Sequence, residues 1–177
     1  MPADKNQLTQ WLHEMKQSRE AFAALYAEMS RPMYTVACRI LHNRADAEDA
    51  VQEAFMKLLR RERTDDIENG RAYLLQTVRN EALMMARKRS HEELQEDVRG
   101  TDENDRPDNF AWENEMMIAE AIEHLKPEER DIVTLHVNGD LTFEEIAKIM
   151  NMSLPAVYRK YRKALDRLRK MMRGGSL

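Results

Sequence analysis

The chain has 177 residues, of which 34% are charged, and a formal net charge of −4. Cys38 is the only cysteine, which excludes an internal disulfide and a cysteine-rich zinc site. Five glycines and five prolines are few for this length, which favours an all-α fold. No apolar run approaches the roughly 20 residues of a membrane span, and the N-terminus lacks the pattern of a signal peptide, so we expect a cytoplasmic protein.

The charges are distributed unevenly along the chain. Residues 71–89 carry five basic side chains and one acidic, and residues 142–177 carry nine basic and three acidic. Between them, residues 90–131 carry fifteen acidic side chains against four basic. Attraction to phosphate depends on the local field rather than on the total charge, so an acidic chain of this kind is compatible with DNA binding.

Apolar residues recur at helical spacing through the first 90 residues. They predict helices over 8–15, 22–29, 33–41 with Pro32 in the first turn, 46–59 with Asp46 as its cap and Leu58 and Leu59 on its apolar face, and 74–89. Residues 61–70 are polar and aperiodic, which predicts a loop. The sequence therefore predicts an N-terminal helical bundle, residues 1–90, that closes near Ser90.

Residues 91–112 are predicted to form a flexible acidic linker. Residues 91–109 contain only two aliphatic side chains, Leu94 and Val98, and such a segment buries too little apolar surface to offset its ordering entropy. Two small helical domains, 1–90 and 113–177, follow from this interpretation. The alternative is a long surface loop inside one domain. As a further hypothesis, the linker screens the two basic segments in the free protein and weakens DNA binding.

The C-terminal domain is predicted to contain a helix-turn-helix. Its first helix carries Met117, Ile118, Ala121, Ile122 and Leu125, and Pro127 begins the second. Thr142 and Glu145 form a capping box for a short helix, residues 151–153 are the turn, and Ser153 caps a long basic helix. A basic helix of this kind fits the major groove. The candidate DNA contacts here are Ser153, Ala156, Arg159, Lys160, Arg162, Lys163 and Arg167.

Three segments resemble a known family. The run GDLTFEEIAKIMNMSLPAVYRKYRKALDRL, residues 139–168, is similar to region 4 of bacterial sigma factors. RADAEDAVQEAFMKLLR, residues 44–60, resembles the region 2 signature of the extracytoplasmic-function (ECF) group, and YLLQTVRNEALMMARKR, residues 73–89, resembles the promoter-melting helix that follows it. The resemblance covers nearly the whole chain, in the family's order.

The resemblance implies a subunit that joins core RNA polymerase, directs it to promoters and assists melting. The residues that match the polymerase-docking motif are Asp46, Glu48, Asp49, Gln52 and Glu53. Region 2 of the family holds flipped bases of the minus-ten element in a loop, here residues 64–71. The implied minus-ten contacts are Arg71, Tyr73, Arg79, Asn80, Arg87, Lys88 and Arg89. Region 4 implies binding to the minus-thirty-five element, and the family implies an anti-sigma factor as a further partner.

Other function classes fit the residues less well. We expect no enzyme, no cofactor and no metal site, because no histidine joins the acidic cluster at ligand spacing and no nucleophile constellation is present. A simple helix-turn-helix repressor would have no use for the region 2 motif. A sigma-like regulator that sequesters an anti-sigma factor would ordinarily need a receiver domain. The chain differs from residues that are common in the family at Tyr73, Met84 and residues 154–156. Because of these differences, the resemblance implies the function but not the promoter sequence that is read.

Overall fold

The computed structural model describes residues 4–93 and 113–174, which fold into eight α-helices and contain no strand. The all-α prediction is therefore confirmed. The chain divides into two compact units, Met1–Asp105 and Arg106–Leu177. Residues 94–112 of the predicted linker, with the screening role suggested for them, lie outside the described residues. The last helix of the first unit continues to Glu93, beyond its predicted end at Arg89 and three residues into the predicted linker.

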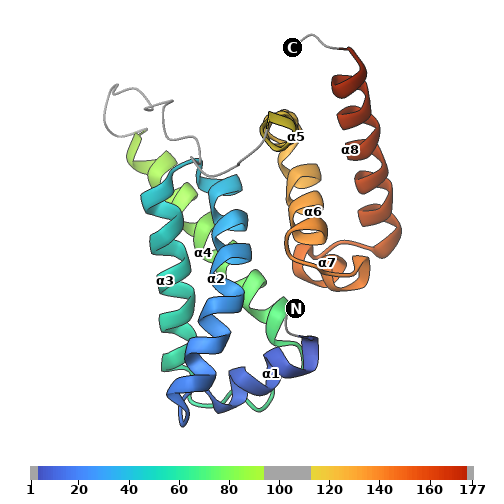
Figure 1. Cartoon of the computed structure of the whole chain (residues 1–177). Helices are drawn as coiled ribbons and strands as arrows, with labels where there is room; N and C mark the ends of the chain where they lie inside the picture. Colours follow the sequence, from blue (N-terminus) through green and yellow to red (C-terminus); the bar gives the residue numbers. More distant parts are fainter. Residues whose placement is uncertain (1–3, 94–112, 175–177) are drawn as a thin grey trace. The chain divides into compact units, whose positions relative to one another are not determined.

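The first unit is a helical bundle. Its helices are α1 (Lys5–Glu14), α2 (Arg19–Leu41), α3 (Arg44–Arg60) and α4 (Gly70–Glu93). Figure 1 shows α2, α3 and α4 side by side, with α1 at the end of the bundle where α4 begins. The largest fully buried side chains of this core are Leu8, Leu12, Leu25, Met29, Met33, Leu58, Leu74 and Leu75. The methionines supply much of the core volume, as their flexible unbranched side chains allow.

Helix α2 is continuous across Pro32, where the sequence predicts a break between two helices. A proline inside a helix removes one backbone hydrogen bond and clashes with the preceding turn. On both sides of it, however, Met29, Met33, Val36 and Ala37 are at most 3% exposed. Burial of this shared apolar face holds the helix together, so Pro32 lies in the middle of α2 and begins no new helix.

Asn43, and not Asp46, caps α3. The Asn43 side chain accepts a hydrogen bond of 2.9 Å from the Asp46 backbone amide, and Asp46 lies in the first turn. His42, with a φ of 53°, ends α2 in the left-handed conformation, so two residues suffice to reverse the chain. The reversal places α3 against α2, and the Asp46 carboxylate remains available for other contacts.

The second unit consists of four helices. They are α5 (Glu113–Glu123), α6 (Pro127–Val137), α7 (Phe143–Met150) and α8 (Leu154–Gly174). A small core of Ile122, Leu125, Val133 and Ala164 joins α5, α6 and α8. Ile118, predicted in the apolar stripe of the first of these helices, is 42% exposed. Nowhere in residues 4–93 and 113–174 is a helix long and apolar enough to cross a membrane.

Candidate nucleic-acid and polymerase interfaces

The helix-turn-helix forms as the sequence predicts. The Thr142 amide donates to the Glu145 carboxylate at 2.7 Å, and the Glu145 amide donates to the Thr142 hydroxyl at 3.3 Å, which completes the capping box of α7. Asn151 ends α7 with a φ of 52°, and the Met152 amide donates back to the Ala147 carbonyl at 2.9 Å. This left-handed residue turns the chain within three positions, and α8 begins at Leu154.

An aromatic cluster sets the angle between α7 and α8. The ring centroids of His136 and Phe143 lie 4.5 Å apart, and Phe143 lies 5.0 Å from Tyr161 and 5.8 Å from Tyr158. The His136 Nδ1 atom lies 2.8 Å from the Leu141 carbonyl and donates to it, because a carbonyl only accepts. Rings packed on three helices leave α8 little freedom to rotate, so its outward face is fixed.

The predicted DNA contacts on α8 fall into two groups. Arg159 and Lys163 are exposed, and within the described residues they have no hydrogen bond or ion pair. Ser153 immediately precedes α8 and is exposed, while Ala156 lies in the first turn of α8 and is half-buried. Arg162 lies against Tyr158, with its guanidinium carbon 6.0 Å from the ring centroid. This first group can reach a nucleic acid without breaking an ion pair.

The second group, Lys160 and Arg167, is held by acidic residues of α6. The Lys160 ammonium is paired with the Glu128 carboxylate, which is exposed. The Arg167 Nη1 atom donates at 3.0 Å to the Glu129 carboxylate, whose side chain is only 6% exposed. Glu128 and Glu129 both lie in the first turn of α6, where acidic residues are common, and no sequence signal separates a buried carboxylate from an exposed one at these adjacent positions.

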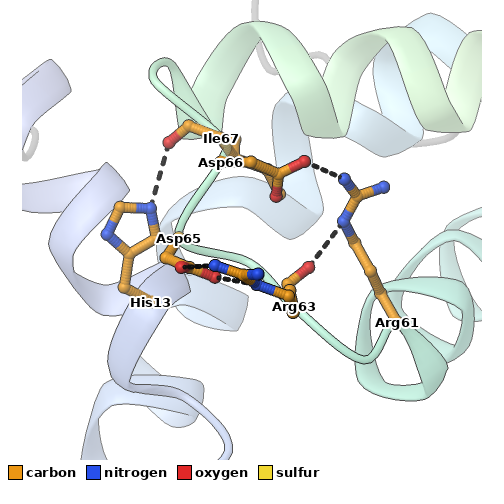
Figure 2. A network of polar contacts seen from close by, with 6 residues as sticks. All are labelled: His13, Arg61, Arg63, Asp65, Asp66 and Ile67. Atoms are coloured by element: carbon orange, nitrogen blue, oxygen red, sulfur yellow. Dashed lines mark hydrogen bonds and ion pairs between the residues drawn. The ribbon is translucent and has the colours of Figure 1, made fainter.

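The loop between α3 and α4 is tightly ordered (Figure 2). Arg61 pairs with the Asp66 carboxylate and donates to the Arg63 carbonyl at 2.7 Å. Arg63 pairs with Asp65 at 2.7 Å, and hydrogen bonds from Arg63 and from a backbone amide lower the pKa of Asp65 to about 2. The Asp65 carboxylate is therefore ionised at neutral pH. The side chains of Asp65 and Asp66 point to solvent and are 63% and 58% exposed.

The predicted minus-ten contacts separate by burial. Arg71 is 5% exposed and pairs with Glu28 at 3.4 Å, so its side chain belongs to the interior of the bundle. Tyr73 lies beneath the Arg61 guanidinium, with the guanidinium carbon 5.5 Å from the ring centroid. Arg79 is half-buried and Asn80 is exposed on α4. The cluster 87–89 at the end of α4 is fully on the surface.

The predicted polymerase-docking residues lie along α3. Glu48, Asp49 and Gln52 are exposed, Glu53 pairs with Arg60 at 3.1 Å, and Asp46 pairs with Arg89 at 3.3 Å. The Asp46–Arg89 pair brings together residues assigned to two different contacts.

Two apolar side chains extend the acidic face of α3. Met56 and Leu59 are 42% and 38% exposed, although the sequence assigns Leu59 to the buried stripe with Leu58. Leu58 is fully buried, whereas Leu59, about 100° further round α3, faces outward. Beside them Tyr26 is 43% exposed, and its ring centroid lies 4.9 Å from that of Phe55. The face therefore combines carboxylates with apolar surface, which suits a protein partner.

Comparisons with known proteins agree with this arrangement. The family model described as Sigma-70 region 2 matches residues 25–92, and that described as Sigma-70, region 4 matches residues 115–168. No curated protein sequence matches the chain. Among solved structures, the fold is similar to the sigma factor RpoE in complex with the anti-sigma factor NepR from Bartonella quintana. That match has a TM-score of 0.72 and 22% identity, and covers 86% of this chain and 96% of the other.

A second solved structure has the same fold. CnrH in complex with the cytosolic domain of CnrY matches with a TM-score of 0.63 and 19% identity, over 98% of this chain and 99% of the other. The two region models match in family order, and each falls on a separately folded unit. Sigma factors initiate transcription and are not enzymes. The chain therefore belongs to the sigma-70 family, as a sigma factor that carries region 2 followed by region 4.

Proposed function

We propose that the first unit docks on core RNA polymerase and opens the minus-ten element, and that the second unit binds the minus-thirty-five element as duplex. The observation that carries this proposal is the division of α8 into two faces. Val157 and Ala164 are fully buried on one side, while Arg159 and Lys163 are exposed on the other and have no ion pair with any residue that the structure describes. A rigid helix with such a cationic face matches the phosphates and base edges of a major groove.

In the proposed duplex complex, the exposed cations of α8 act first. Arg159 and Lys163 do not have to break an ion pair with a described residue, so they are proposed to contact the DNA first. Lys160 must leave Glu128 before it contacts DNA, and phosphate competes for it most strongly at low salt. Arg167 is retained by a buried carboxylate, and we assign it to holding α8 against α6. Leu154, 40% exposed at the start of α8, is placed to contact a thymine methyl group.

In the proposed minus-ten contact, the loop and the end of α4 have different tasks. The outward carboxylates of Asp65 and Asp66 would repel phosphate but can accept hydrogen bonds from the amino groups of unpaired bases. The cluster 87–89 would follow the backbone of the displaced strand. Arg71 is assigned to the core, because its side chain is buried against Glu28.

Core polymerase is proposed to bind the outer face of α3, through the acidic residues predicted from the sequence together with Met56 and Leu59. An anti-sigma factor is proposed to compete for this mixed apolar and acidic surface. RpoE was solved with the anti-sigma factor NepR, and CnrH with the cytosolic domain of CnrY. Because core polymerase is a cytoplasmic enzyme, we place the protein in the cytoplasm.

In vitro transcription with purified core polymerase on a pool of genomic DNA fragments tests the proposal. Wild-type protein plus core should initiate at a defined set of start sites that neither component uses alone. Arg159→Ala should retain polymerase binding and lose promoter selection. Asp49→Lys should lose polymerase binding and retain affinity for the selected duplex. If Arg159→Ala abolished association with polymerase, the assignment of tasks to the two units would be wrong.

A further inference from the structure

Helix α1 lies outside the residues that match the region 2 model, which begins at residue 25. Its side chains nevertheless reach the ordered loop that precedes α4. The Thr9 hydroxyl accepts a hydrogen bond of 3.0 Å from the Gly70 amide, and the His13 Nε2 atom donates at 3.0 Å to the Ile67 carbonyl. Lys16, in the turn after α1, donates to the Arg61 carbonyl. Figure 2 shows His13 reaching Ile67 across the gap between the two segments.

Two of these residues share one side of α1, and the third follows it. Positions 9 and 13 are four residues apart, a step that brings side chains to the same face of a helix, and Lys16 lies in the turn after the helix. Lys16 contacts a backbone carbonyl at the beginning of the loop, and His13 contacts one near its end. Thr9 contacts the backbone amide of the first residue of α4. Because all three contacts are made to backbone, they constrain the path of the loop whatever its side chains are.

The packing at Gly70 shows how closely α1 approaches. A Cβ atom on this residue would lie 3.2 Å from the Thr9 Cα atom and 3.3 Å from the Leu12 Cδ1 atom. Contacts this short require the neighbour to move, and the first of them is backbone. Leu8 and Leu12 are fully buried, so α1 itself cannot shift freely. The start of α4 and the face of α1 are therefore fitted to each other.

The loop uses its own side chains for the remaining interactions. Thr64 and Ile67 are 7% and 5% exposed and anchor it inward, while Asp65 and Asp66 point outward to their arginine partners. The backbone carbonyls at positions 61 and 67 accept hydrogen bonds from Lys16 and His13. The loop thus has a defined shape without DNA. A preformed site pays its ordering cost before binding, which strengthens discrimination between ligands.

We propose that α1 positions the minus-ten reading loop, so that Thr9, His13 and Lys16 determine base selectivity without touching DNA. This inference rests on the proposed role of the loop. When these contacts are removed, the loop samples other shapes, and Asp65 and Asp66 no longer present their carboxylates in one arrangement. The preference for the favoured base at the minus-ten element should then fall by roughly threefold to tenfold per contact removed.

The test compares the variants Thr9→Val and His13→Ala with the control Gln10→Ala. Gln10 is exposed on α1, and within the described residues its side chain bonds to Glu14, four residues along the same helix. Transcription from templates with a randomised minus-ten element measures selectivity, and hydrogen exchange of residues 61–70 measures loop order. We expect faster exchange, including at the Gly70 amide for Thr9→Val, and weaker selectivity, with polymerase binding and duplex affinity unchanged. The control should behave as wild type.

The double variant Asp65→Asn, Asp66→Asn separates the proposed base-reading role of the loop from the proposed positioning role of α1. If this double variant changes base preference and the α1 variants do not, the loop reads the base and the positioning role of α1 is refuted. If even the double variant leaves the preference unchanged, the proposed role of the loop itself fails. Should Thr9→Val and His13→Ala prove unstable, the milder His13→Gln, which keeps a donor, is expected to restore wild-type exchange and selectivity. Failure of that rescue would also refute the proposal.

Discussion

Replacement of Arg167 by alanine should destabilise the second unit rather than weaken its contact with DNA. The Arg167 guanidinium donates to Glu129, whose side chain is 6% exposed and has this guanidinium as its ion-pair partner. Truncation of the arginine leaves a carboxylate in the interior without its compensating charge.

The expected cost follows from burial. Removal of one partner of a buried ion pair costs about 3–5 kcal/mol, because the other charge is left uncompensated. Arg167 is 39% exposed, so water can reach the site, and we expect about 2–3 kcal/mol. A domain of this size loses roughly 4–8 °C of melting temperature per kcal/mol. Glu129→Gln should cost about 1 kcal/mol, because the amide oxygen still accepts from Arg167.

Scanning calorimetry of the full chain measures this effect, and Arg169→Ala is the matched control. Arg169 lies on the same helix and pairs with Asp166, but both side chains are at least 60% exposed, so its loss should cost less than about 1 kcal/mol. Replacement of both Arg167 and Glu129 by methionine should recover most of the lost stability.

Binding to a duplex promoter at several salt concentrations provides the second measurement. Loss of a phosphate contact lowers the salt dependence of binding by about one unit of slope, which we expect for Lys163→Ala and not for Arg167→Ala. An Arg167→Ala protein with an unchanged melting temperature and a reduced slope would refute the reasoning, because Arg167 would then be a phosphate contact.

Three further predictions concern other charged or buried groups. Glu128→Gln should release Lys160 and raise duplex affinity severalfold at low salt; equal affinity of variant and wild type in anisotropy titrations would show that Lys160 stays away from DNA. Lys57→Met should destabilise the first unit by about 2–4 kcal/mol in denaturant unfolding, because Glu81 is 5% exposed and loses its partner; a midpoint like that of wild type would contradict this. Burial raises the pKa of the Cys38 thiol, so near pH 8 less thiolate is present in the folded state, and alkylation should be slower there than in denaturant.

The local pattern of the sequence was sufficient to predict most of the helices. The capping box at Thr142 and Glu145, the three-residue turn and the start of α6 at Pro127 were predicted correctly, because each depends on residues within one or two helical turns. The continuity of α2 across Pro32 was not, since a proline's local preference is opposed there by burial of side chains on both sides. Burial is a property of the whole bundle, and a local pattern does not contain it.

The candidate sites show the same division between local and tertiary information. Composition and spacing predicted a cationic helix face, and the exposed Arg159 and Lys163 lie there as expected. Arg71 and Arg167 belong to the same residue type, yet each pairs with a glutamate 43 or 38 positions away. An arginine in a basic segment has the same sequence signature whether it faces DNA or a buried carboxylate, and only the fold separates the two.

The loop before α4 depends most strongly on tertiary structure. Its polar, aperiodic residues predicted that it would be a loop, but not its contacts with His13 and Thr9, which are 54 and 61 positions away from their partners. The sequence by itself determined most of the helical elements, the two regions and the family, because these depend on short-range periodicity and motifs. The tertiary structure decided which charges remain available to a partner and which are used internally, because that depends on the long-range approach of helices.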